Sequence, residues 1–119
     1  MSYSPILIIP GEKKSIFFEI FFKSIKKNKF QSPLILIASK KIVLSQMKRH
    51  KYLKKINLIN TKNLKKLSFN NKKINLIDVF CKNISNPNSY VKNCFDISFK
   101  IIKSGFTNKL LNGPIDKTK

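Results

Sequence analysis

Short apolar runs alternate along the chain with longer segments in which apolar residues recur every three or four positions. The runs at residues 5–9 (PILII) and 34–38 (LILIA) are uninterrupted and rich in Ile and Leu. Runs of this kind are typical of strands that are covered on both faces, as in parallel sheets. They predict two neighbouring central strands. Three further runs, at 56–59, 74–79 and 109–112, predict shorter or weaker strands.

The first segment with helical spacing covers residues 14–28, between the two central strands. Glu19 stands four residues before Lys23, which is the favourable order for an ion pair along a helix. Strand, helix and strand within about 35 residues form a βαβ unit. Its expected apolar face consists of Ile16, Phe17, Ile20, Phe21 and Ile25.

Two more helices are expected further along the chain. Ser39 is a candidate N-cap for a helix that continues to about Lys48, with Val43, Leu44 and Met47 directed inward. The second covers about 89–104: Asp96 and Lys100 have the spacing of an ion pair, and Gly105 stands at the position where a glycine ends a helix. Its apolar positions are Tyr90, Val91, Cys94, Ile97, Ile101 and Ile102.

The alternation of strands and helices predicts an α/β fold with three layers and a mostly parallel sheet. Residues 60–73 are polar and rich in Lys and Asn, so we expect a surface segment there. The string Ile-Asn-Leu-Ile occurs at 56–59 and again at 74–77. In a chain of this composition we interpret the recurrence as coincidence and not as an internal repeat.

The composition allows one domain with an apolar core, since 42% of the 119 residues are hydrophobic. Against 25 Lys and Arg residues there are 5 Asp and Glu residues, a formal charge of +20 that suggests a polyanionic partner. Arg49 is the sole arginine, however, although base and phosphate recognition favour arginine. The lysines are also spread along the chain, as coding sequence rich in A and T would produce. We favour biased composition, with a small basic nucleic-acid-binding protein as the alternative.

A membrane location has less support in the sequence. No uncharged apolar run approaches the roughly 20 residues needed to cross a bilayer, and residues 1–5 lack the pattern of a signal peptide. Residues 15–30 are rich in Phe and Lys and could lie on a lipid surface. The strands on both sides favour a crossover helix instead, and we expect a cytoplasmic protein.

Several common sites are excluded by residue counts. The three glycines, Gly11, Gly105 and Gly113, are too few and too scattered for a dinucleotide-binding loop or a Walker A loop. Cys81 and Cys94 lack the number and spacing of a zinc site or a disulfide framework. His50 lies far from both in sequence, outside any nucleophile motif, and is expected at the surface.

Candidate chemistry is therefore limited to turns that follow strands, where α/β enzymes gather functional groups. Glu12 and Asp116 are the acids in such turns, after 5–9 and 109–112 respectively. Glu12 could instead complement the dipole at the start of the following helix.

These two turns resemble motifs of the 4-hydroxythreonine-4-phosphate dehydrogenases. Residues 10–12 (PGE), with Ile16 and Glu19, are similar to the opening motif G-[DE]-P-A-G-I-G-P-E, although residues 13–15, 17 and 18 differ from it. Residues 113–117 (GPIDK) resemble the later motif G-P-[IV]-x-K, with Asn112 where the family usually has Thr. The segments between the motifs follow the family's order, so the resemblance covers essentially the whole chain.

The resemblance implies an NAD-dependent oxidoreductase of vitamin B6 (pyridoxine) biosynthesis, which oxidises 4-hydroxy-L-threonine phosphate before decarboxylation. It implies a homodimer of two-domain subunits with an isocitrate/isopropylmalate dehydrogenase-like fold, a divalent metal held by three histidines, and an active site at the domain cleft. It places Glu12, Gly113, Asp116 and Lys117 close to the substrate or cofactor. The metal and substrate ligands of the family follow the second motif, so neither catalytic nor metal-binding residues are assigned here.

On this interpretation, residues 1–119 form part of an amino-terminal domain, without the second domain and the carboxyl-terminal return. We expect such a fragment to be inactive alone and to bind NAD and metal poorly.

Overall fold

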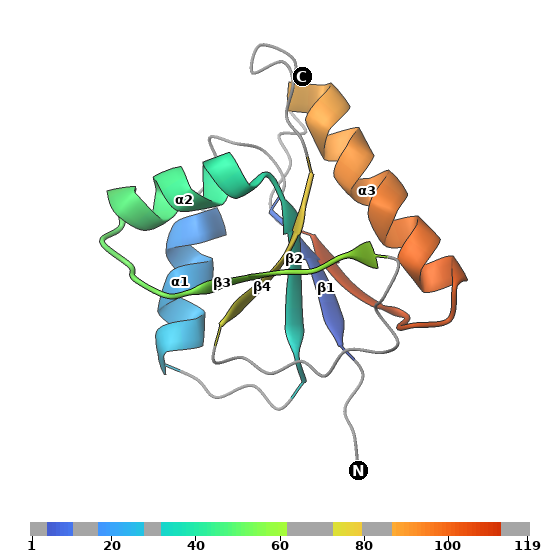
Figure 1. Cartoon of the computed structure of the whole chain (residues 1–119), viewed down its shortest axis with the longest axis horizontal. Coiled ribbons are helices and arrows are strands. Elements are labelled where there is room, and N and C mark those ends of the chain that lie inside the picture. Colours follow the sequence, from blue (N-terminus) through green and yellow to red (C-terminus); the bar gives the residue numbers. More distant parts are fainter. Residues whose placement is uncertain (1–4, 11–16, 28–31, 62–72, 80–86, 113–119) are drawn as a thin grey trace.

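The computed structural model describes residues 5–10, 17–27, 32–61, 73–79 and 87–112 of the chain. Within these residues, helices and strands alternate along most of the chain (Figure 1). The elements are β1 (Ile6–Ile9), α1 (Phe17–Lys27), β2 (Leu34–Ala38), α2 (Lys40–Arg49), β3 (Ile56–Leu58), β4 (Ile74–Asp78), α3 (Pro87–Lys103) and β5 (Lys109–Asn112).

The five strands form one sheet in the order β3-β4-β2-β1-β5, and every neighbouring pair is parallel. α1 and α2 lie on one face of the sheet and α3 lies on the other (Figure 1). This confirms the three-layer α/β fold. β1 and β2 are neighbours inside the sheet, as their continuous apolar runs predicted, because residues on both faces of these strands are covered.

The core is divided by the sheet into two clusters. Leu7 and Ile35 belong to the cluster beneath α3, whereas Ile8 and Leu36 belong to the cluster beneath α1 and α2. All four are at most 5% exposed. Since burying one Leu or Ile side chain contributes roughly 1.5–3 kcal/mol, the two central strands hold all three layers together.

The buried face of α1 differs from the expected one. Phe18, Phe21 and Phe22 are buried, while Ile20 is 52% exposed. The expected face was therefore wrong at Ile20. With four phenylalanines on adjacent faces, the helix turns the face with the larger aromatic area toward the sheet.

The inward residues of α2 were also only partly predicted. Val43 and Met47 are buried, but Leu44 is 47% exposed. In α3, by contrast, Tyr90, Cys94 and Ile101 are buried, and Gly105 follows the helix with a φ of 86°, as expected for a glycine that ends a helix. The helix begins at Pro87, two residues earlier than predicted.

One of the two predicted ion pairs is present. The Lys23 ammonium lies 3.2 Å from the Glu19 carboxylate on the exposed side of α1. Asp96 and Lys100 form no ion pair with each other or with any other residue that the structure describes.

The two Ile-Asn-Leu-Ile strings lie side by side in β3 and β4. Ile56 pairs with Ile74, Asn57 with Asn75 and Leu58 with Leu76, so identical residues face each other. The Asn57 amide donates a hydrogen bond of 3.2 Å to the Asn75 side-chain oxygen, and the Asn75 amide donates one of 3.1 Å to the backbone carbonyl of Leu34. The recurrence of the string was interpreted as coincidence, but the two copies form a paired set of strands in register.

In the part of the chain that the structure describes, none of the helices combines the length and the apolar character needed to cross a bilayer.

Candidate functional site at the carboxyl edge of the sheet

All five strands end at the same edge of the sheet because they are parallel. In open α/β sheets, ligands bind outside this carboxyl edge. β1 and β5 are neighbours, and their last residues, Ile9 and Asn112, are in register. The two segments that carry the resemblance therefore leave the sheet from adjacent strands, although they are about a hundred positions apart in sequence.

The predicted site residues themselves, Glu12, Gly113, Asp116 and Lys117, lie outside the described residues. What the structure provides is the position of the strands that precede them. Pro10, the residue before Gly11, is buried at the end of β1.

The central part of the edge is organised by hydrogen bonds to the start of α2. The Ser39 backbone N–H donates to the Tyr90 hydroxyl of α3 at 2.7 Å. The next N–H, that of Lys40, donates to Asp78 Oδ1 at the end of β4, at 2.9 Å. Side chains from α3 and β4 thereby fix the N-terminus of α2 at the carboxyl edge.

This arrangement corrects one prediction. Ser39 occupies the N-cap position with an extended backbone (φ −72°, ψ 129°), but its side chain makes no capping hydrogen bond. Ser39 is only 4% exposed, and the carboxylate of Asp78 provides the capping acceptor instead.

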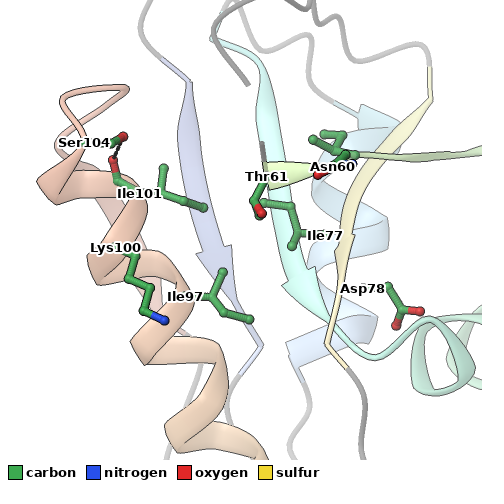
Figure 2. Close-up of a pocket in the computed structure, with 9 residues that line it drawn as sticks. Asn60, Thr61, Ile77, Asp78, Ile97, Lys100, Ile101 and Ser104 are labelled. Carbon is green, nitrogen blue, oxygen red and sulfur yellow. Dashed lines mark hydrogen bonds between the residues drawn. The ribbon is translucent and has the colours of Figure 1, made fainter. Parts of the chain in front are cut away.

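A pocket of about 510 Å³ opens beside these groups, between α3 and the ends of β3 and β4 (Figure 2). Its volume lies within the range of small-molecule sites, which is roughly 300–1,000 Å³. The lining residues are Ile59, Asn60, Thr61, Ile77, Asp78, Ile97, Lys100, Ile101 and Ser104.

Some polar groups of the pocket already form hydrogen bonds within the protein, whereas others form none within the described part of the chain. Ser104 Oγ donates to the backbone carbonyl of Ile101 at 2.6 Å. The Asp78 carboxylate lies on the side of β4 away from α3 (Figure 2), where it accepts the Lys40 N–H. The Lys100 side chain extends along the pocket wall from α3 (Figure 2). Its ammonium has no hydrogen bond or ion pair with the described residues.

The donor set for a metal ion is absent from the described part of the chain, which contains no group of three or more His, Cys, Asp or Glu side chains that could hold one. His50 is half-buried at the end of α2, with its ring centroid 6.1 Å from that of Phe22. Cys94 is a buried free thiol in the core beneath α3. Among the residues that the structure describes, none therefore supplies the histidine site for the metal that the resemblance implies.

The pocket and the roles of Asp78 and Tyr90 were not predicted from the sequence. Asp78 was placed inside a strand, and Tyr90 was recognised only as a core position. An acid as the last residue of a strand, at the edge where helices begin, was the available signal for Asp78. Lys100 was assigned to a pair with Asp96, which concealed its position in the pocket.

The fold and this edge define a class of protein: three-layer α/β domains with an open parallel sheet. No family model matches the sequence, and no curated protein does. Solved structures do match. A 4-hydroxythreonine-4-phosphate dehydrogenase from Burkholderia phymatum is similar over 98% of this chain, with a TM-score of 0.74 and 15% identity. One from Klebsiella pneumoniae is similar over 97%, with a TM-score of 0.75 and 16% identity.

The chain spans 38% of the length of each of these two structures. At such low identities the comparisons show the fold. The resemblance inferred from the two motifs is confirmed at that level, as a match to part of a 4-hydroxythreonine-4-phosphate dehydrogenase structure.

Proposed function

We propose that this chain is part of an NAD-dependent dehydrogenase that acts on 4-hydroxy-L-threonine phosphate. One observation carries the proposal. β1 and β5, which precede the two motif-like segments, end in register on adjacent strands of a sheet whose fold matches such dehydrogenases over nearly the whole chain.

The roles proposed for the chain's own residues rest on their chemistry and on the resemblance of the two segments. Gly11 and Gly113 allow the backbone to approach a ligand closely, since they lack a Cβ. Lys117 supplies a positive charge for a phosphate or carboxylate group, and Glu12 and Asp116 accept hydrogen bonds from hydroxyl or amine groups.

The larger assembly belongs to the proposal as well. Residues 1–119 would form part of a first domain, and the second domain would complete the cleft in a cytoplasmic homodimer. NAD would accept the hydride. The metal ligands would come from other segments of the protein, because the described residues do not supply them.

The basic nucleic-acid-binding alternative has no comparable observation in its favour. Such proteins stack bases on exposed aromatic rings. Phe18, Phe21 and Phe22 are instead buried in the core. Phe99 is 55% exposed, but its ring packs at a tilt on Phe95, with ring centroids 5.9 Å apart.

Nucleotide sequence downstream of the codon for Lys119 provides the first test. We expect a continuing frame that soon encodes a Gly-His-Thr run and later further histidines. A stop codon directly after Lys119, combined with a chain that folds and is expressed alone, would overturn the proposal.

Activity of the full product provides the second test. We expect NADH formation from 4-hydroxy-L-threonine phosphate, with kcat/KM reduced about 10- to 100-fold by Lys117→Ala through loss of a charge-assisted contact. Lys103→Gln, on the exposed end of α3, is the matched control and should leave kcat/KM unchanged.

A further inference from the structure

The pocket between α3 and the strand ends exists because α3 does not cover the whole face of the sheet. The helix packs on β1 and β2. β3 and β4 extend beyond it, and the groove along its side has Ile97 and Ile101 on one wall and Ile59 and Ile77 on the other. Ile59, Ile77 and Ile101 are each less than 10% exposed. These three side chains belong to the core cluster beneath α3, so packing holds the apolar walls of the pocket in place.

Lys100 makes the apolar groove selective for negative charge. Its ammonium has no counter-ion among the described residues. Asp78 turns away toward α2 (Figure 2), and Asp96 does not line the pocket. An ammonium at the edge of apolar walls favours a ligand that combines an anionic head with an apolar body.

The residue types that line the pocket further restrict the chemical class of ligand that it can bind. The apolar lining is aliphatic and contains no aromatic ring, so a planar ring would find no stacking partner in the described lining. The single ammonium of Lys100 matches a ligand with one negative charge. Asn60 and Thr61 lie on the wall opposite α3 (Figure 2).

We infer that this pocket binds a small amphiphilic monoanion, namely a carboxylate with an aliphatic chain, whose head contacts Lys100 and whose chain lies between the four isoleucines. The site does not depend on the proposed function, because none of its residues belongs to the two motif-like segments.

Isoleucine methyl NMR on the whole chain tests the inference, with sodium octanoate as the probe. Saturable shifts are expected for the methyl groups of Ile59, Ile77, Ile97 and Ile101. The methyl group of Ile8, on the opposite face of the sheet, should not shift. Shifts that do not saturate at millimolar octanoate, or that include Ile8 equally, would overturn the inference.

Two lysine variants separate a specific head-group contact from general attraction to a basic protein. Lys100→Gln should weaken octanoate binding about three- to tenfold, the effect of losing one partly exposed ion pair. Lys103→Gln, one turn further along α3 and outside the pocket lining, should leave binding unchanged. Equal effects of the two variants would contradict the site.

Binding of octanol, and binding of octanoate at raised ionic strength, test whether the pocket recognises the negative charge. Octanol should bind more weakly than octanoate to the unaltered chain and with similar strength to Lys100→Gln, since it lacks the charge. Raising the ionic strength should weaken octanoate binding alone. Octanol binding as tight as that of octanoate would exclude recognition of the anion.

Discussion

Lys51 adopts a backbone conformation that usually belongs to glycine. Its φ is 52°, and it directly follows the C-cap residue His50 of α2. Tyr52 N–H donates to the carbonyl of Met47 at 2.9 Å, and Lys51 N–H donates to that of Lys48 at 3.3 Å. These are the two hydrogen bonds of a Schellman motif, in which the left-handed residue closes the helix. A lysine there retains steric strain between its Cβ and the backbone.

Lys51→Gly should therefore stabilise the chain. Removing the Cβ relieves about 1 kcal/mol of strain, partly offset by the greater freedom of glycine in the unfolded chain, so we expect a gain of about 0.5 kcal/mol in the free energy of unfolding. Urea unfolding measures the change. Lys48→Gly, within α2, is the control and should cost about 1 kcal/mol. A loss of stability in both variants would show that Lys51 is not strained.

Tyr52 gives the chain a specific response to alkaline pH. Its ring stacks on Phe22 at 4.7 Å with an interplanar angle of 11°, and burial raises the pKa of its hydroxyl above the ordinary value of 10.0. Because the pKa is higher in the folded state, the protonated Tyr52 hydroxyl makes its full contribution to the free energy of unfolding below pH 10. This contribution is lost as the pH rises from there through the folded pKa.

Tyr52→Phe should reduce this response because the ring remains and the ionisable group is removed. Urea unfolding at pH 8 and pH 10.5 should show a larger loss of stability in the unaltered chain than in the variant. All other ionisable groups are the same in both proteins, so the difference between the two pH profiles isolates Tyr52. Parallel pH profiles would contradict the argument.

At the scale of elements, the beginning of α2 depends on its neighbours. The helix has no acid in its first turn, and Ser39 does not cap it with its side chain. The carboxylate of Asp78, 38 residues later, accepts the Lys40 N–H instead. The same contact ties the end of β4 to a helix that packs on the sheet, so one side chain links two elements.

Asp78→Ala should cost about 1 kcal/mol of stability, the usual value of a lost capping acceptor. Asp78→Asn retains an acceptor oxygen and should recover part of the loss. Asp96→Ala removes another exposed acid, on α3, that forms no ion pair with the described residues, and it should change stability little. Chemical denaturation of the three variants tests the order, and an equal loss in Asp78→Ala and Asp96→Ala would refute the capping role.

At the scale of the whole molecule, the local pattern of apolar and polar residues was sufficient to predict which segments form strands and which form helices. Continuous runs such as Leu34–Ala38 could be predicted as central strands because residues on both faces need apolar cover. The orientation of α1 could not, since Phe18 and Phe22 compete with Ile20 and Phe17 for the same sheet, and only packing selects between them. The edge positions of β3 and β5 depend on contacts between distant segments, which periodicity does not contain.

The candidate site also has a part that could be predicted from the sequence and a part that could not. The motif-like segments could be read from the sequence, and the register of Ile9 with Asn112 places the strands before them side by side. The pocket could not be predicted, because its lining comes from three separate segments, 59–61, 77–78 and 97–104, without a shared motif. Its lysine is one of many in a chain of charge +20 and becomes distinctive only through its position.

The pairing of the two Ile-Asn-Leu-Ile strings has a consequence for folding. Only one of the strands β3 and β4 can lie next to β2, yet both offer β2 the same side chains in the same order. Because the strings are identical, we expect them to be near-equivalent competitors for this position during folding. The residues just after the strings differ: Asp78 accepts the Lys40 N–H at the start of α2 and carries a negative charge there, whereas the neutral Asn60 follows the string in β3. We therefore expect the negative charge of Asp78 at the N-terminus of α2 to favour the observed strand order over the exchanged one.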